Sequence, residues 1–356
     1  MSENFIRRYD VDSVRVLAIF LLIVYHSVIG FQPWGKDVYF IVNKDFLESI
    51  WLIMMAINIW RIPILFVVSG MGVYFAMRRR TAWQLIGDRA YRIFLPFWFG
   101  VFFIAPIHEY LFYVYNEKIY EYTPTFGHLW FLFNIFIYIL FLLPVFIYFK
   151  KFPGNFIFKS IRYLISKPFV IIPVFSLPIV IEVLLLQPKT FEGYILEPGH
   201  GFILGLLCFL SGFIFVSLGK DFWISVQKAK FLSLVLSISF YLIRILVLLE
   251  SEFKEDYSNL FLAIECSTWM LTIFGFAATY FNRPSKALSY LSSAVYPVYI
   301  FHMIAQYSFS ILIFPIGIPA LIKYLILVTA TIGGSFLLYE IFKRIRWVRI
   351  LVGISR

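Results

Sequence analysis

The amino-acid sequence predicts an all-α fold, a polytopic helical bundle in a membrane, with about ten spanning helices and both chain ends in the cytoplasm. Three observations support this prediction. The composition is 61% hydrophobic and 14% charged, whereas soluble domains are about 45–50% apolar and about 25% charged. Apolar runs of about 20 residues, the length that crosses a bilayer, recur along the chain. Lys and Arg residues gather in alternate connections between these runs.

Ten segments are apolar and long enough to be candidate spans. They cover residues 14–33, 49–76, 93–113, 129–149, 169–187, 200–218, 231–250, 260–281, 291–314 and 320–341. We expect the second to tilt or to break near Pro63. The fifth is the weakest, because it contains two prolines and Glu182. No polar stretch is long enough for a separate soluble domain, so residues 1–356 are predicted to form a single membrane domain.

The basic residues predict the orientation of the chain. With a cytoplasmic N-terminus, the inner segments hold 23 of the 31 Lys and Arg residues, including Arg356, and the outer loops hold five, including Lys254. This asymmetry follows the positive-inside rule for an even number of spans. It also accounts for the net charge of +11, so nucleic acid is not expected as a partner. Both cysteines, Cys208 and Cys266, lie in apolar runs, and no disulfide framework is implied.

The first predicted helix carries two polar residues on one face. Arg15 and His26 are eleven residues apart, which places them about 20° apart around the helix and about 16 Å apart along its axis. Asp12 lies one turn from Arg15 and can pair with it. A neutral His in an apolar site can take a proton from a hydroxyl, and an Arg at the membrane surface can hold a phosphate. The alternative is that His26 hydrogen-bonds a neighbouring helix and Arg15 only anchors the helix end.

Further basic and polar residues lie in or beside other spans. Arg89 and Arg92 share a helix face at the start of the third span and suit a phosphate or pantetheine-diphosphate, with positive-inside charge as the alternative. Arg61 lies within the second span and needs a buried partner. His128 opens the fourth span, where an interfacial aromatic belt is the simpler interpretation. His302 lies inside the ninth span. Structural pairing is expected for the remaining polar residues of the spans, which are His108, Glu109, Glu182, Arg244 and Glu265.

Five ordered motifs resemble the membrane acyltransferase 3 family, a group of bacterial integral membrane enzymes that O-acylate glycans. The motifs are Asp12-Ser13-Val14-Arg15 with His26, Phe66-Val67-Val68-Ser69-Gly70, Arg89-Ala90-Tyr91-Arg92 with Leu95-Pro96, His128-Leu129-Trp130-Phe131-Leu132, and Ser293 to His302. Together they cover nearly the whole chain. Within the family, the first motif, Arg61 and Tyr339-Glu340 are most similar to the type that succinylates periplasmic glucans.

The resemblance implies a donor and an acceptor on opposite sides of the cell inner (plasma) membrane. The donor would be a cytoplasmic acyl-CoA, either acetyl-CoA or succinyl-CoA, and the acceptor a hydroxyl of an extracytoplasmic glycan. Arg15, Arg89 and Arg92 would hold the CoA phosphates, and Asp12 would orient Arg15. The pantetheine arm would then reach towards His26.

The resemblance also implies roles for the residues around the acyl group. His26 would act as general base on the hydroxyl, or would be acylated first and pass the group on. His302, His128 and Arg61 would orient the acceptor or stabilise the oxyanion. No metal is expected, because the His residues lack ligand spacing. The oligomeric state is not predicted.

Two other classes of protein would also place polar residues inside a membrane. A transporter or flippase for a glycan or lipid-linked sugar would use intramembrane Arg and His, but the sequence shows no inverted repeat with paired broken helices. A structural or sensory protein would use polar residues only to fasten helices together. The number and order of the motifs favour the enzyme.

Overall fold

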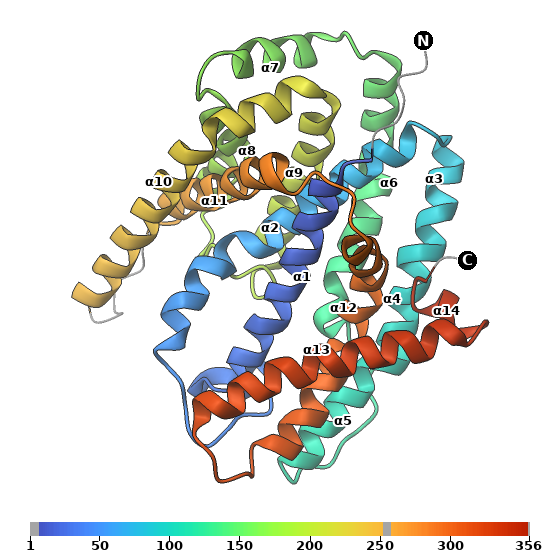
Figure 1. The fold of residues 1–356 in the computed structure, drawn as a ribbon, viewed down its shortest axis with the longest axis vertical. Coiled ribbons are helices and arrows are strands. Elements are labelled where there is room, and N and C mark those ends of the chain that lie inside the picture. Colours follow the sequence, from blue (N-terminus) through green and yellow to red (C-terminus); the bar gives the residue numbers. More distant parts are fainter. Residues whose placement is uncertain (1–6, 252–257, 355–356) are drawn as a thin grey trace. The chain divides into compact units, whose positions relative to one another are not determined.

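The computed structural model describes residues 7–251 and 258–354, and these residues form helices and no strand (Figure 1). Lys254 and Arg356, which entered the prediction of topology, lie outside the described residues. The α-helices are α1 (Tyr9–Ile29), α2 (Ile50–Met77), α3 (Ala82–Arg89), α4 (Leu95–Phe99), α5 (Ala105–Tyr115), α6 (Trp130–Lys151), α7 (Phe156–Ser166), α8 (Ile171–Leu186), α9 (Pro198–Ser217), α10 (Lys220–Glu250), α11 (Asn259–Tyr280), α12 (Lys286–Ile313), α13 (Ala320–Arg344) and α14 (Val348–Leu351).

Nine helices in the described residues are long and apolar enough to cross a membrane. The fifth predicted span, 169–187, forms α8, which has only 16 residues. At 1.5 Å per residue it is about 24 Å long, shorter than the roughly 30 Å hydrocarbon core. It ends at Gln187, whose left-handed backbone (φ 46°) cannot continue a helix. The all-helical membrane fold is thus confirmed, while the cytoplasmic position of both termini stays a prediction.

Three predicted spans differ in detail from the expectation, and the seventh, predicted over 231–250, is the longer helix α10 (Lys220–Glu250). α2 runs unbroken from Ile50 to Met77 with Pro63 inside it, so a break is absent and the alternative, a tilt, stays a prediction. The third span is longer than expected and covers 82–115. It contains two π-helical turns, η2 (Ala90–Phe94) and η3 (Gly100–Ile104), each adding a residue to the local helical repeat. Such π-turns occur frequently at functional sites.

The helices are grouped into two compact units, each made of several stretches of the chain. The first unit takes in the described parts of residues 1–18, 56–85 and 138–289, and the second those of 19–55, 86–137 and 290–356. The first therefore contains α7 to α11, and α10 and α11 lie side by side within it (Figure 1). The second contains most of α12 and all of α13 and α14. A single membrane domain over the whole chain stays a prediction.

Close contact between α2 and α9 organises the first unit. A Cβ placed on Gly70 would lie 1.9 Å from the Phe209 carbonyl oxygen, and one placed on Gly212 would lie 1.9 Å from the Val67 carbonyl oxygen. Two glycines therefore let the two backbones touch, as small residues do where membrane helices pack. This packing explains the glycine of the motif Phe66-Val67-Val68-Ser69-Gly70.

One face of α10 is apolar and exposed. Phe231, Val235, Leu242 and Leu246 form a stripe at helical spacing, and each is at least half exposed. A stripe of this kind suits contact with lipid, since a membrane helix gains nothing by covering apolar side chains.

Candidate active site

Four imidazole rings come together in the second unit. They belong to His26 of α1, His108 of α5, His302 of α12 and His128 of η4 (Gly127–Leu129), the short turn before α6. His302 is fully buried, and His26 and His128 are half-buried. Ring centroids lie 5.1 Å apart for His26 and His302, 5.0 Å for His128 and His302, and 5.5 Å for His108 and His128. Three residues singled out in the sequence, His26, His128 and His302, are thus brought together.

His26 and His302 form an in-plane hydrogen bond. His26 Nδ1 lies 2.9 Å from His302 Nε2, and the ring planes differ by 16°. With each nitrogen about 1.1 Å from its ring centroid, a linear in-plane N–H···N bond predicts a centroid separation of about 5.1 Å, which is the value found. The two rings are therefore joined edge to edge, not stacked face to face.

The carbonyl group of Tyr299 determines which nitrogen of each ring carries the proton. His302 Nδ1 lies 2.6 Å from the carbonyl oxygen of Tyr299, and a carbonyl can only accept, so His302 Nδ1 carries the proton. In neutral His302 the Nε2 atom is then an acceptor, and it receives the hydrogen of His26 Nδ1–H. The Nε2 atom of neutral His26 is left with its lone pair, which is the state a general base requires.

The other two imidazoles are positioned by α12 and its neighbours. His128 Nε2 donates to the Ile300 carbonyl at 3.2 Å, and the Tyr299 hydroxyl donates to the His128 carbonyl. His128 Nδ1 is buried and has no hydrogen-bond partner among the described residues. His108 contacts the Tyr307 ring at 5.2 Å. These contacts of His128 join segments about 170 residues apart, so spacing within one helix could not predict them.

Two further residues of α12 that bond to neighbouring segments were missed in the sequence. The Gln306 side-chain amide donates to the His26 carbonyl at 2.8 Å, and the Tyr307 hydroxyl donates to the Tyr39 carbonyl at 2.6 Å. Tyr299, His302 and Gln306 follow one another at intervals of three and four, so they share a face of α12. That spacing was a signal in the sequence, because a polar stripe in an apolar helix must face protein.

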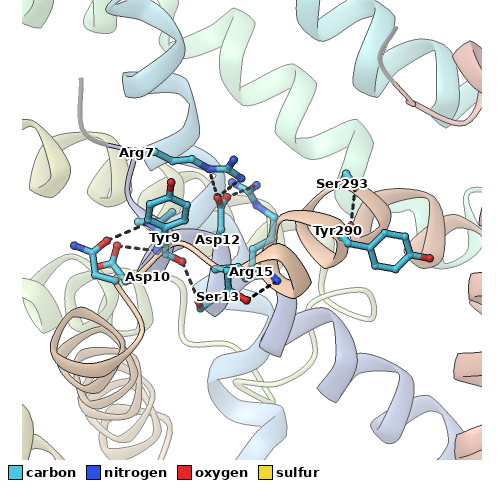
Figure 2. A network of polar contacts seen from close by, with 12 residues as sticks. Arg7, Tyr9, Asp10, Asp12, Ser13, Arg15, Tyr290 and Ser293 are labelled. Carbon is cyan, nitrogen blue, oxygen red and sulfur yellow. Dashed lines mark hydrogen bonds and ion pairs between the residues drawn. The ribbon is translucent and has the colours of Figure 1, made fainter. Parts of the chain in front are cut away.

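The arginine predicted on the first helix lies in the first unit. Arg15 Nη1 is 3.5 Å from Asp12 Oδ1, so the expected pair forms. Arg7 binds the other oxygen of Asp12 more closely, at 2.9 Å from Nε and 2.7 Å from Nη2, and Figure 2 shows Asp12 between the two arginines. A Cβ on Gly72 would lie 3.7 Å from Arg15 Nη2, so α2 approaches the guanidinium closely. α1 is continuous from Tyr9 to Ile29, as the spacing argument for Arg15 and His26 requires.

The second pair of predicted arginines lies in the second unit. Arg92 Nε is 2.9 Å from Asp88 Oδ1, one turn away, and the Arg92 side chain is 47% exposed. The π-turn η2 follows Arg89 and contains Arg92. The Tyr296 hydroxyl donates to the Ile93 carbonyl at 3.4 Å, so η2 is tied to α12. Tyr296 lies six residues before His302, which is about 9 Å along the helix axis.

Arg61 lies in a charged network of the first unit. It is 1% exposed, and its Nη2 donates to Asn58 Oδ1 at 3.2 Å. Asn58 in turn donates to Glu192 at 2.8 Å, and Arg244 binds both Glu192 (3.2 Å) and Glu265 (2.9 Å). Ionic groups inside a membrane are costly and persist when they are paired. The network that Arg61 enters through Asn58 thus joins α2 to α10, α11 and the loop before α9.

That loop, residues 187–197, is held by polar contacts from several sides. His200 lies between Glu182 Oε1 (2.7 Å) and the Phe191 carbonyl (2.9 Å). The Glu197 carboxylate accepts from the backbone N–H groups of Thr190 (2.8 Å) and Lys189 (2.9 Å), which lower its pKa.

In the described part of the chain, no three His, Cys, Asp or Glu side chains form a group that could hold a metal ion.

Comparison with known families adds an observation on the whole chain. A family model described as an acyltransferase domain, Acyl_transf_3, matches residues 8–340. The chain belongs to the acyltransferase 3 family. This confirms the family expected from the five motifs, and the protein is a multi-pass membrane acyltransferase. No curated protein and no solved structure matches the chain, and the likeness to the glucan-succinylating type of the family stays a prediction.

Proposed function

We propose that this acyltransferase moves an acetyl or succinyl group from cytoplasmic acyl-CoA to a hydroxyl of an extracytoplasmic glycan, with His26 as general base. One observation carries the proposal: the chain of hydrogen bonds from the Tyr299 carbonyl through His302 to His26. It leaves His26 Nε2 as the basic atom. The arrangement has the logic of a catalytic triad, in which a third group holds the tautomer of the catalytic His.

The reaction then needs only one proton shuttle. His26 Nε2 takes the proton of the acceptor hydroxyl while the hydroxyl oxygen attacks the thioester carbonyl carbon. The C–S bond breaks, and the CoA thiolate takes the proton back from His26. While His26 is an imidazolium, its Nδ1–H bond to His302 becomes charge-assisted and therefore stronger. The acylated-His route would use the same lone pair as nucleophile.

The donor phosphates are assigned to arginines whose guanidinium groups are held but remain accessible. Arg15 and Arg92 each pair with a carboxylate of their own helix, Asp12 and Asp88, and their side chains are 33% and 47% exposed. A guanidinium oriented in this way presents its remaining N–H groups to a phosphate. Arg89 is assigned the same role because it directly precedes η2, the turn that contains Arg92.

The roles of the two other predicted residues rest on different support. His128 Nδ1 is a buried lone pair beside His302, and we assign it to accept a hydrogen bond from the sugar. Arg61 is bound to Asn58 within the first unit. The charged network around Asn58 supports a role in fastening that unit, and oxyanion stabilisation by Arg61 stays a prediction.

The test is transfer of radiolabel from acetyl-CoA and succinyl-CoA to extracted glycans, in membranes that carry the wild type or His26→Ala. General-base removal is expected to lower the rate by roughly 10²–10⁴-fold, and the better donor identifies the acyl group. If neither donor is used and His26→Ala behaves as the wild type does in the cell, the catalytic assignment fails. A glycan transporter would then be the better interpretation.

A further inference from the structure

A group of aromatic side chains in the second unit stands exposed close to the four imidazoles. Tyr39, Tyr110 and Tyr122 are 62%, 51% and 60% exposed. They belong to the segment after η1 (Pro33–Val38), to α5 and to the loop from 116 to 126, which joins α5 to η4. Two neighbours of these rings, Glu109 of α5 and Tyr120 of the loop, carry further polar groups. We call Tyr39, Glu109, Tyr110 and Tyr120 the rim.

Tyr39 caps the C-terminal end of η1 in a left-handed backbone conformation, and its backbone N–H donates to the Lys36 carbonyl at 3.1 Å. Its φ is +65°, in the left-handed region that a bulky residue rarely occupies and that costs free energy. Its carbonyl accepts from the Tyr307 hydroxyl (2.6 Å), and its ring packs edge-on against Phe112 at 5.7 Å. The cap and these two contacts fix the position of Tyr39, whose ring remains exposed.

Tyr39 is linked to the imidazoles by short contacts. Its neighbour Phe40 lies edge-on against His26 at 5.7 Å between ring centroids. Tyr307, which binds the Tyr39 carbonyl, also contacts His108. A molecule resting on the Tyr39 ring would therefore lie beside the residues that surround His26.

Glu109 supplies an acceptor of hydrogen bonds within the rim. It is half-buried, follows His108 directly on α5, and receives a hydrogen bond from the Thr125 hydroxyl across the loop. Tyr120 packs edge-on against Tyr110 at 5.8 Å. Burial and the Glu109 charge raise the pKa of Tyr120, so its hydroxyl stays protonated and can donate.

These groups together match the chemistry of a sugar ring. A pyranose has an apolar C–H face that rests on an aromatic ring, and adjacent hydroxyls that donate to a carboxylate. An aromatic belt for lipid needs no carboxylate among the rings. We propose that Tyr39 and Glu109 bind a pyranose of the acceptor glycan and present one of its hydroxyls to His26. This inference rests on the proposed function and names the binding site of its acceptor.

The experiment measures glycan binding separately from catalysis. Purified protein in lipid nanodiscs is titrated with α- and β-linked glucose oligosaccharides of different lengths, and saturation-transfer NMR and calorimetry give the affinity. Tyr39→Asn removes the ring with a residue that tolerates the left-handed conformation, and Tyr39→Trp keeps an aromatic face. Glu109→Gln removes the charge. Ile119→Ala is the control, because Ile119 is 89% exposed in the same loop.

We expect the affinity to fall roughly tenfold or more in Tyr39→Asn and in Glu109→Gln, a loss of the size found at aromatic and charged contacts. Tyr39→Trp and Ile119→Ala should bind as the wild type does. Unchanged affinity in Tyr39→Asn and Glu109→Gln, or no binding of any oligosaccharide by the wild type, overturns the assignment. Binding that depends on these residues without any acyl transfer would leave the sugar site standing and defeat the proposed function.

Discussion

His26 Nδ1 and His302 Nε2 lie 2.9 Å apart in rings that are nearly coplanar, although the two residues are 276 positions apart in the chain. The bond has a defined direction, because the Tyr299 carbonyl at 2.6 Å requires the proton on His302 Nδ1. The catalytic proposal can therefore be tested at His302 as well as at His26.

A substitution at His302 should affect the rate according to whether it can accept a hydrogen bond. In His302→Gln the amide oxygen can still receive the His26 Nδ1–H, so we expect the maximal transfer rate to fall only about tenfold. His302→Leu offers no acceptor and should lower it by roughly 10²–10³-fold. The measurement is the maximal transfer rate and the KM for acyl-CoA, in membranes with equal amounts of protein. Equal rates in the two variants would show that His302 does not set the His26 tautomer.

Arg15 should control the affinity for the donor. Replacing a guanidinium that binds phosphate removes a charge-assisted hydrogen bond of about 1.5–3 kcal/mol. Arg15→Gln should therefore raise the KM for acyl-CoA by roughly 10–100-fold, with a smaller change in the maximal rate. Arg162→Gln is a matched control, since Arg162 is also partly exposed and paired with a carboxylate, Asp221. A similar rise in KM in both variants would attribute the effect to general surface charge.

The α2–α9 contact should not tolerate a methyl group. In Gly70→Ala the new Cβ would lie 1.9 Å from the Phe209 carbonyl oxygen, so the backbones must separate. We expect a loss of stability of about 1–3 kcal/mol, as in other overpacked cores, seen as a lower thermal unfolding temperature in detergent. Gly87→Ala has nothing within 4 Å of its Cβ and should be neutral or stabilising. An unfolding temperature that Gly70→Ala leaves unchanged would contradict this close packing of α2 and α9.

The 187–197 loop should loosen in acid. Backbone N–H groups of Thr190 and Lys189 lower the pKa of Glu197 below its usual value of 4.5. Because the folded pKa is lowered, this stabilisation is present above pH 4.5 and is lost as the pH falls through the lowered pKa. Protection of the two amides against hydrogen exchange should fall over that range. In Glu197→Gln the same protection should not depend on pH, and a wild-type profile without such a fall would exclude the role given to Glu197.

The sequence by itself determined the fold class and the family. Length and apolarity decide where a helix can cross a bilayer, because the membrane accepts little else, and nine predicted spans are found as helices of sufficient length among the described residues. The prediction was weakest at 169–187, where prolines and Glu182 accompany a shorter helix. Helical spacing also placed Asp12 beside Arg15 correctly, since residues three apart on one helix are neighbours.

Only the tertiary structure decided which polar residues act together. His26, His128 and His302 come from three distant segments, and no periodicity within one helix could reveal that two of them share a proton. The hydrogen bond of Arg61 to Asn58, in the charged network of the first unit, was likewise not predictable from the sequence. The physical reason is that a buried polar group must find its partner across helices, and helix packing, not local sequence, decides which partner is within hydrogen-bonding distance.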